Sequence, residues 1–421
     1  VPYTGRAQRG GFVRIGEQSL WKDHVYPLWN PYVFLGMPSF GSGGYNPLIY
    51  PPDWPVALLQ KVLPLPEMTW LLLYYFLGAL FAYLLACEWG ARPEGALLGA
   101  VAFVFQPNLV AVGAHGHGSQ LVDSAYLPLM LWLAARWMRR GTLADLGALA
   151  LAGGFQMLRG HVQICFYTWL AIGIYALVLV LASLRDRAVL APQLGRAAAL
   201  GVAAALAFGI AGFYNLPLSD YAHWSIRGSR ADGGVGMTYA TQWSLAPIEL
   251  PTIVVPAWAG FGGQTYWGGM PFTDYPNAYV GMITVVLAVP AFLAGGPARS
   301  FALALAAFSL LISFGHNAPF YGWLYDRLPL FNKFRIPVMI ILLFQLAAAL
   351  GAAWGWSSLL EPPAAKANSN RRLRALVASA LALVLLGVVG GLAHDAWRGW
   401  YVGTAVASHA GYPPQAAEIA F

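Results

Sequence analysis

Long apolar runs separated by short polar stretches fill the chain between residues 66 and 393. A helix needs about 20 mostly apolar residues to cross the hydrocarbon core of a bilayer. Windows of this kind predict about ten transmembrane helices, and the short fourth one contains Gly153-Gly154, which indicates a break or close helix packing. The predicted spans are Pro66–Cys87, Gly95–Gly113, Gln120–Met138, Leu143–Leu158, Val162–Leu184, Gly195–Leu216, Ala278–Gly295, Phe301–Gly315, Ile336–Leu360 and Leu373–Ala393.

Composition supports this assignment, because 58% of the residues are hydrophobic and only 10% are charged. A soluble domain carries about 25% charged residues, so this chain cannot cover one or two globular domains with a polar surface. We therefore predict an all-α integral membrane protein with long extracytoplasmic loops. Cys87 and Cys165 lie within or at the edge of apolar runs and are interpreted as buried thiols, with a disulfide or a metal pair as the alternative.

The basic residues follow the topology of a multi-pass membrane protein. The net charge of +7 comes from residues scattered over short loops, which does not resemble a phosphate-binding face for nucleic acid. Short loops rich in Lys and Arg alternate with loops that have almost none, and cytoplasmic loops carry the excess of positive charge. The cytoplasmic set is Arg92, Arg136, Arg139, Arg140, Arg185, Arg187, Arg196, Arg299, Lys366, Arg371, Arg372 and Arg374.

This orientation divides the chain into five parts and places the protein in a cytoplasmic membrane. We predict an extracytoplasmic first loop at 1–65, transmembrane helices at 66–216, an extracytoplasmic loop at 217–277, transmembrane helices at 278–393 and an extracytoplasmic segment at 394–421. Because Val1 then starts outside, we expect an upstream span in the natural protein. We also expect the segment that ends at Phe421 to continue.

Few polar residues interrupt the predicted spans. Gln106-Pro107-Asn108 breaks the second span, and Asp123 and Asp145 lie near helix starts. A proton-coupled transporter usually has paired carboxylates at mid-membrane depth, so this pattern weakens a transporter hypothesis. Asp123 is interpreted as an N-cap or first-turn acid of its own helix.

The outward loops carry the more informative residues. Pro27–Tyr32 and Tyr45–Pro52 combine turn-forming Pro and Gly with aromatic residues. This is typical of an ordered loop at the membrane interface, and equally of a roof over a lipid-facing cavity whose Trp and Tyr stack on a sugar. The candidate sugar-binding residues are Trp29, Asn30, Tyr50 and Gln163.

Histidines and cations on the same predicted side are candidate phosphate ligands. His115 and His117 lie in a Gly-rich turn, which is weak evidence for a metal site and better suited to phosphate binding or proton transfer. His161 follows Arg159-Gly160, and Lys333 and Arg335 meet a helix start. A cluster of such residues would suit a phosphate or diphosphate headgroup, whereas snorkelling toward lipid headgroups is the alternative. We predict no metal site from the residues.

The long loops add no soluble enzyme motif. Ser225–Arg230 is basic, and Trp258–Gly269 alternates aromatic residues with glycines, as a carbohydrate-stacking surface or an interfacial loop would. The chain contains no Walker motif, no dinucleotide motif after a strand and no nucleophile elbow. A cytoplasmic nucleotide-using enzyme is therefore not expected, since the cytoplasmic loops are too short to hold a site.

In these segments the chain resembles the YfhO-like family of bacterial membrane proteins, which look like members of the GT-C superfamily of glycosyltransferases. The matching pieces follow one another over about Pro27–Leu360, and none is a strict catalytic signature. They are Pro27–Pro38, Tyr45–Trp54, Ala114–Leu131, Arg159–Tyr167, Asn215–Arg227 and Ile312–Pro337.

The resemblance implies a sugar donor linked to polyprenyl phosphate and an envelope glycan, lipid or protein as acceptor. In this superfamily an acid in the first outer loop acts as base or metal ligand, which leaves a divalent metal ion as an optional cofactor. The acids of the visible first loop are Glu17, Asp23 and Asp53, and none stands where the family places its acid. Asp23 is the candidate base, while the family's own acid is expected before Val1.

Three functions follow from these observations. The leading hypothesis is a GT-C-type glycosyltransferase whose donor phosphate lies near His117, His161, Arg335 and Lys333. The second is a non-catalytic GT-C-like subunit of a larger membrane assembly with protein partners, suggested by the absent acid. The third is a flippase or transporter of lipid-linked sugars, which would need a polar path between helices.

Overall fold

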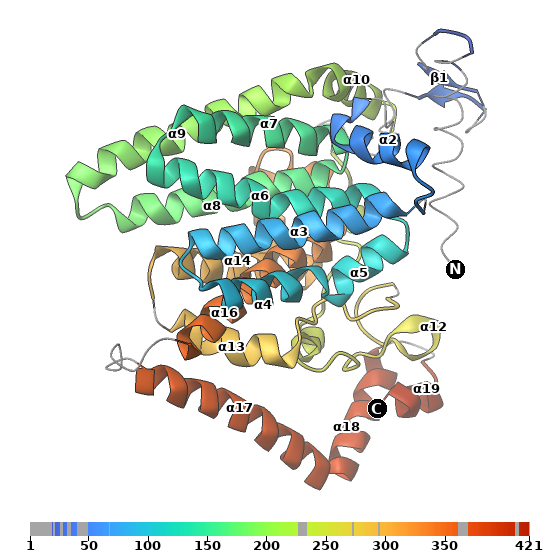
Figure 1. Ribbon diagram of the computed structural model, residues 1–421. Helices are drawn as coiled ribbons and strands as arrows, with labels where there is room; N and C mark the ends of the chain where they lie inside the picture. The colour runs from blue at the N-terminus through green and yellow to red at the C-terminus, as the bar shows by residue number, and fades with distance from the viewer. Residues whose placement is uncertain are drawn as a thin grey trace. The chain divides into compact units, whose positions relative to one another are not determined.

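The computed structural model shows a mostly helical chain (Figure 1). It describes residues 19, 22–25, 28–31, 35–39, 49–66, 68–225, 234–271, 273–293, 295–360, 369–408 and 412–420. One antiparallel pair of short strands, β1 (Trp29–Asn30) and β2 (Met37–Pro38), belongs to the first loop. The chain forms two compact units, one made of Val1–Phe81 and Ala111–Val235 and the other of Ala82–Val110 and Gly236–Phe421.

Helices occupy all ten windows that the apolar pattern predicts. The described α-helices are α2 (Trp54–Val62), α3 (Thr69–Glu88), α4 (Pro93–Val104), α5 (Pro107–Ala114), α6 (Gly118–Arg140), α7 (Leu143–Arg159), α8 (Val162–Ala182), α9 (Arg187–Ile210), α10 (Gly212–Ala222), α11 (Met237–Ala240), α12 (Gly262–Thr265), α13 (Met282–Phe292), α14 (Pro297–Ser313), α15 (Pro319–Arg327), α16 (Ile341–Leu359), α17 (Ser369–Leu392), α18 (His394–Ser408) and α19 (Pro414–Ala420). Short 3-10 turns are η2 (Pro51–Asp53), η4 (Pro247–Ile253), η5 (Gly315–Asn317), η6 (Phe331–Lys333) and η7 (Pro337–Ile340).

Only part of this set is long and apolar enough to cross a membrane unaided. In the described ranges, five helical segments meet that requirement: α3, α8, α9, Pro337–Leu359 and Arg374–Leu392. The bent pair α4 and α5 makes a sixth when counted as one span. The chain is therefore an all-α protein with several apolar helices that can cross a membrane. That α6, α7, α13 and α14 also cross it stays a prediction.

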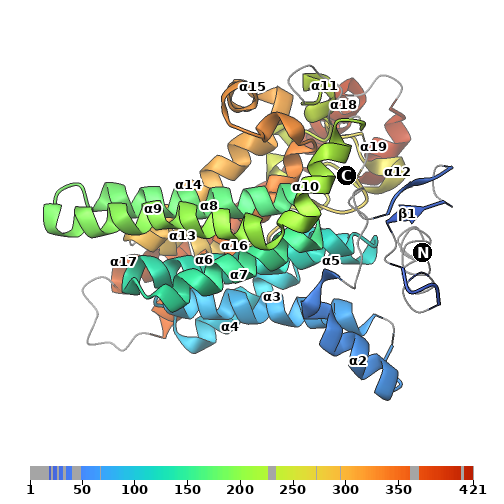
Figure 2. The same ribbon diagram turned by 90° about the horizontal axis from the view of Figure 1, so that it is seen from above.

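In the first unit, α6, α7, α8 and α9 pack side by side (Figures 1 and 2). Gly141 ends α6 with φ of 69°, a left-handed conformation that favours glycine and lets the chain reverse into α7. Arg196 of α9 donates from Nη1 to the carbonyl oxygens of Met138 (2.7 Å) and Arg139 (3.1 Å). A cation there satisfies free carbonyls at the C-terminus of α6, where the helix dipole is negative.

The glycine pair in α7 permits close helix packing. The helix continues through Gly153 and Gly154 without a break. A Cβ at Gly153 would lie 3.0 Å from the Cβ of Ala207, and one at Gly154 would lie 2.6 Å from Ile210 Cγ2. The close-packing interpretation of this pair is therefore confirmed, and its partner is α9.

In the second unit, α16 packs between α4 and α13 through small residues on two of its faces. Gly95 and Gly99 of α4 lie against α16, so that a Cβ at Gly99 would stand 2.7 Å from the Ala349 carbonyl oxygen. On another face, a Cβ at Gly355 would overlap the backbone of Leu287 in α13. Glycines four residues apart allow helix backbones to approach closely, which is a common way to join helices in membranes.

The predicted interruption at Gln106-Pro107-Asn108 is confirmed as a bend of 48° between α4 and α5. The amide of Asn108 donates to Gln345 Oε1 of α16 at 3.0 Å, and Gln345 Nε2 donates to the carbonyl oxygen of Asn277 at 2.8 Å. These buried polar groups pair with one another, as polar groups in an apolar interior must.

Both thiols are free of disulfides. Cys165 is buried in α8, and its Sγ lies 3.6 Å from Asp123 Oδ2. Cys87 near the end of α3 is half-buried. The interpretation of a buried thiol is thus confirmed for Cys165.

Candidate functional site

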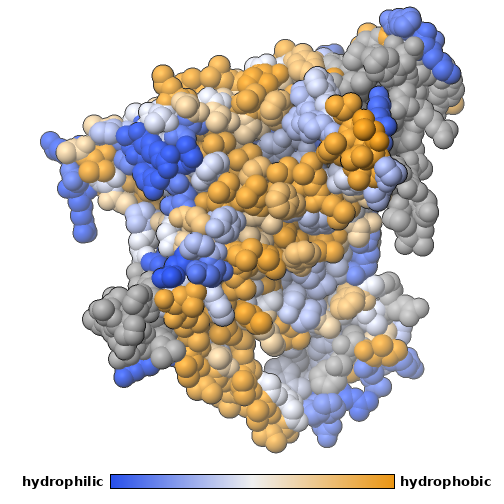
Figure 3. Space-filling view, viewed as in Figure 1, coloured by the Kyte–Doolittle hydropathy of each residue, from blue (hydrophilic) through white to orange (hydrophobic). Residues whose placement is uncertain are grey.

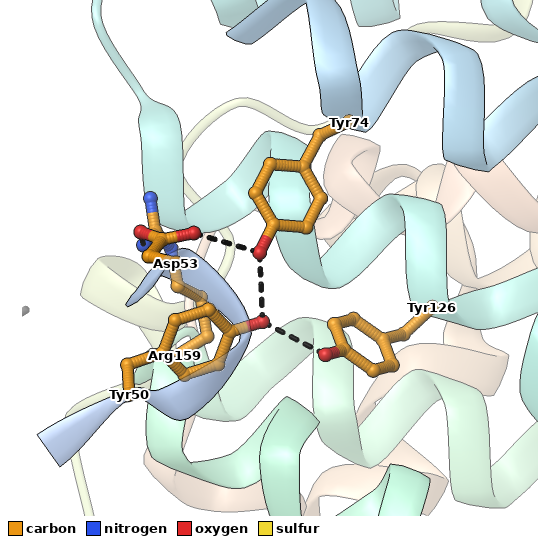
Figure 4. A network of polar contacts seen from close by, with 5 residues as sticks. All are labelled: Tyr50, Asp53, Tyr74, Tyr126 and Arg159. Atoms are coloured by element: carbon orange, nitrogen blue, oxygen red, sulfur yellow. Dashed lines mark hydrogen bonds and ion pairs between the residues drawn. The ribbon is translucent and has the colours of Figure 1, made fainter. Parts of the chain in front are cut away.

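A buried ion pair anchors the first loop to the helices of the first unit (Figure 4). Asp53 ends the turn η2, where Pro51 and Pro52 fix the backbone just before α2. Arg159 is the last residue of α7, and Gly160 with φ of 89° stops the helix there. Arg159 Nη1 donates to Asp53 Oδ2 at 2.8 Å, and the two residues are only 3% and 6% exposed.

Three tyrosines extend this ion pair into a chain of hydroxyl groups. Tyr74 of α3 donates to Asp53 Oδ1 at 2.8 Å. The Tyr74 and Tyr50 hydroxyl oxygens are 3.3 Å apart, and those of Tyr50 and Tyr126 are 2.8 Å apart. An ionised carboxylate can only accept hydrogen bonds, so Tyr74 donates to Asp53. Tyr50 can then donate to Tyr74 and Tyr126 to Tyr50, so that each hydroxyl proton has an acceptor. The chain gives a proton a continuous path from Tyr126 to Asp53.

Aromatic rings enclose the guanidinium of Arg159. Its Cζ lies 5.2 Å from the ring centre of Tyr50, 5.4 Å from that of Trp70 and 5.9 Å from that of Tyr74. Aromatic faces attract cations over such distances, and more strongly where water is excluded. Burial and the neighbouring Tyr126 and Tyr74 also raise the pKa of Tyr50 well above its usual range, so its hydroxyl stays protonated.

A second buried carboxylate stands next to this network. Asp123 Oδ2 accepts the backbone N–H of His161 at 2.9 Å, directly before α8. The interpretation of Asp123 as N-cap or first-turn acid of its own helix is wrong, because α6 begins at Gly118 and its first turn contains no acid. Its Oδ2 instead satisfies a backbone N–H at the start of α8, where the first N–H groups have no partner within the helix. This contact depends on tertiary packing and could not be seen along the sequence.

The histidines predicted to bind phosphate lie beside the same network. His117 is the N-cap of α6. The next residue, Gly118, packs so closely on Trp70 that a Cβ would lie 2.6 Å from the indole ring. His161 follows Arg159 by two residues and is the N-cap of α8, where its Nδ1 accepts the N–H of Ile164 at 3.4 Å. Both histidines therefore belong to the end of the first unit that holds Asp53.

His117 shares this turn with a second histidine, His115. Its exposed ring still loses hydration to surrounding protein atoms, and this effect together with His115 lowers the pKa of His117 from its ordinary 6.5. At neutral pH the imidazole is uncharged. It can then accept a proton or a hydrogen bond, but it does not neutralise an anion unless the anion itself raises its pKa.

Acidification is expected to destabilise the protein through His117. The pKa is lower in the folded than in the unfolded state, so below about pH 6.5 the unfolded state binds the proton more readily. The free energy of unfolding should therefore fall as the pH drops below that value. Melting temperatures measured at pH 7.5 and 5.5 should differ more in the wild type than in His117→Asn, and equal differences would refute the assignment.

The other residues predicted to act in the site, one candidate base and three candidate substrate ligands, range from exposed to fully buried. Asp23 is exposed in the first loop, and Trp29 is 57% exposed on β1. Asn30 is fully buried. Gln163 is buried at the start of α8, where its Nε2 donates to the Tyr167 hydroxyl at 2.9 Å. Of the four predicted sugar-binding residues, Tyr50 lies in the Asp53 network.

Lys333 and Arg335 belong to the second unit, on a strained stretch of backbone. Leu330 and Ile336 have φ of 67° and 60°, a left-handed conformation that is costly for a β-branched residue such as Ile336. Strain of this kind concentrates where a structure holds particular side chains in place. Arg335 stacks on the ring of Tyr239 with its Cζ 5.2 Å from the ring centre. That these cations bind phosphate stays a prediction.

The sequence pattern alone does not distinguish Asp53 from the other first-loop acids, and it does not single out Arg159. Both lie in segments that carry the family resemblance, Tyr45–Trp54 and Arg159–Tyr167. One signal was available, because an acid and an arginine that both border apolar helices are costly unless they pair. Among the described residues, no group of three or more His, Cys, Asp or Glu side chains could hold a metal ion.

Comparison of the chain with protein-family models, with curated proteins and with solved structures finds no match.

Proposed function

We propose that this protein is a glycosyltransferase of the GT-C type, working at the outer face of a bacterial cytoplasmic membrane. It would transfer a sugar from a polyprenyl-phosphate donor to a cell-envelope acceptor. The observation that carries the proposal is the Asp53 carboxylate: it belongs to the first loop, it is almost fully buried, and Arg159 and Tyr74 fix its orientation. An oriented carboxylate in that loop is the group that such a transfer requires.

The reaction assigns each group a balanced role. The acceptor hydroxyl oxygen attacks the anomeric carbon of the donor sugar, and its proton passes to the Asp53 carboxylate. The bond between the anomeric carbon and the phosphate oxygen breaks, and its electrons stay on the departing polyprenyl phosphate. His117 and His161, which border the Asp53 network, would hydrogen-bond that phosphate.

In this proposal Asp53 takes the place given above to Asp23. Asp23 is exposed, so water surrounds its carboxylate and nothing in the described contacts fixes its direction. Asp53 instead accepts two hydrogen bonds in an aromatic enclosure. A fixed, partly dehydrated carboxylate is better able to remove a proton from one particular hydroxyl.

The test is an assay of polyprenyl-phosphate release. Membranes containing the full chain are given polyprenyl phosphates carrying different radiolabelled monosaccharides, together with envelope material as acceptor. Asp53→Asn should reduce release by at least about a hundredfold, the usual scale for loss of a general base. Asp23→Asn is the matched control and should retain wild-type activity.

A reversed result, in which Asp23→Asn is inactive and Asp53→Asn is active, would return the role of base to Asp23. Both variants must first reach the membrane in wild-type amounts and be shown to stay folded at the assay temperature, because Asp53→Asn leaves the buried Arg159 guanidinium without its counter-ion and is expected to lower the melting temperature. Asp53→Glu, which keeps the charge but shifts its position, should lose most of the activity as well.

One observation favours a second candidate, a non-catalytic subunit of a membrane assembly. Both oxygens of Asp53 are already bonded within the protein, to Arg159 and Tyr74, as in a purely structural anchor. This candidate predicts no polyprenyl-phosphate release by the wild type with any of the sugars. It also predicts that the protein purifies with other subunits at fixed stoichiometry, and that Asp53→Asn loosens this association.

A further inference from the structure

A tryptophan-lined groove lies in the second unit, apart from the residues used in the proposed function. Its volume is 580 Å³, within the roughly 300–1,000 Å³ of typical small-molecule sites. Its lining comes from η4, from Trp258 a few residues after it and from the start of α18, and includes Ile248, Pro251, Trp258, Ala396, Trp397 and Trp400. The residues that line it carry no charge, so the groove suits an apolar occupant.

The three indoles form a packed wall. The ring centres of Trp397 and Trp400 are 5.5 Å apart, and those of Trp258 and Trp400 are 5.8 Å apart. Trp258 Nε1 donates to the Ile248 carbonyl oxygen at 2.7 Å, which fixes the ring in the groove. Beneath it, the buried Tyr401 accepts from Trp267 Nε1 at 2.8 Å. Such a wall is held in place before any ligand arrives.

The helix that leads to this groove is a membrane-spanning candidate that packs on α13 along one side and is otherwise exposed. The window Arg374–Leu392 of α17 has a mean hydropathy of 2.5, and none of it is buried within the chain. Its surface is almost continuously hydrophobic (Figure 3). Leu381, Leu385 and Leu392 are 60%, 62% and 85% exposed, which is costly unless hydrocarbon covers them.

The groove begins where this span ends. α17 stops at Leu392 and α18 starts at His394. The lining residues Ala393 and Ala396 follow directly. Tryptophan is enriched at the level of the lipid headgroups, just outside the hydrocarbon core, and Trp397 and Trp400 occupy that level if α17 spans the membrane. Lipid that covers α17 is therefore next to the mouth of the groove.

We propose that the groove binds one acyl chain of a bilayer phospholipid whose remaining chain stays in the membrane beside α17. The occupant is a hydrocarbon because the lining offers indole faces, proline and aliphatic side chains and no charge. We assign it to the bulk lipid because the groove begins at the end of α17, whose exposed apolar surface the bulk lipid covers when α17 spans the membrane. A lipid held there joins α18 and η4 at the membrane surface.

Photocrosslinking in a lipid bilayer tests this site. The full chain is placed in nanodiscs of phosphatidylcholine, of which a part carries a diazirine near the end of one acyl chain. After irradiation, mass spectrometry maps the labelled residues. Labelling should be stronger on Ala396–Trp400 and Pro247–Pro251 than on the exposed leucines of α17. Ala396→Phe should reduce the groove labelling by about tenfold, because the new ring fills the space.

Ala407→Phe is the matched control, since Ala407 is also exposed on α18 but does not line the groove. It should leave the labelling unchanged, and α17 labelling should stay constant in both variants as evidence of correct insertion. Even labelling of groove and α17, or labelling that Ala396→Phe does not alter, would overturn the proposal. Displacement by polyprenyl phosphate, at an amount where added phosphatidylcholine has no effect, would overturn it in favour of an isoprenoid occupant.

Discussion

Replacing Arg159 with methionine is expected to destabilise the protein by about 3–5 kcal/mol, because the Asp53 carboxylate is then buried without its cation. The two side chains are 2% and 8% exposed, so water cannot replace the missing guanidinium. Trp70, Tyr50 and Tyr74 also lose the cation that their rings surround. Chemical unfolding in detergent measures the change in the free energy of unfolding.

The double variant Asp53→Asn/Arg159→Met separates the ion pair from packing. Removing both charges leaves no buried unpaired charge, so the double variant should be more stable than Arg159→Met alone. If the two single changes simply added, the residues would act independently and the proposed anchor would be wrong. This comparison uses stability alone and therefore stands whether or not the protein is an enzyme.

Gly355→Ala is expected to destabilise the second unit by about 3 kcal/mol, near the upper end of the cost of overpacking. The added Cβ would overlap the carbonyl oxygen, carbonyl carbon and Cα of Leu287. Those atoms are backbone, so α13 and α16 must separate and no side-chain rotation relieves the overlap. The loss should be visible as a lower melting temperature in detergent.

Gly387→Ala in α17 is the matched control. No atom of another element lies within 4 Å of the position that its Cβ would occupy, and the residue is inside a helix. Alanine has a higher helix propensity than glycine, so this variant should be as stable as the wild type or more stable by up to about 1 kcal/mol. Equal melting temperatures for Gly355→Ala and Gly387→Ala would contradict the close packing of α13 on α16.

The helices could be placed from the sequence because their signal is local. The windows Leu143–Leu158 and Val162–Leu184 correspond within a few residues to α7 (Leu143–Arg159) and α8 (Val162–Ala182). Length was harder to predict: the window Ala278–Gly295 shortens to α13 (Met282–Phe292), since Gly281 adopts a left-handed φ of 90° before it. Apolar runs give the position of a helix, whereas turn geometry decides its ends.

The candidate site could not be predicted in the same way because it depends on contacts between distant segments. Asp53 resembles the other first-loop acids until Arg159, 106 residues later, folds against it. The hydrogen bond of Asp123 could not be predicted for the same reason, since its donor is the backbone N–H of His161, 38 residues later. The packing role of the glycines in α4 and α16 could not be predicted from the sequence either, because it depends on which helix packs against them.

The separation of Asp53 from Arg159 also sets a delay during synthesis. At a translation rate of about 5–20 residues per second, the 106 residues from Asp53 to Arg159 take roughly 5–20 s to be synthesised. Throughout that interval Tyr50 and the Asp53 carboxylate of the first loop have no Arg159 to pack against. A protease added to nascent chains stalled before α7 should therefore cut the loop, and it should spare chains stalled after α8.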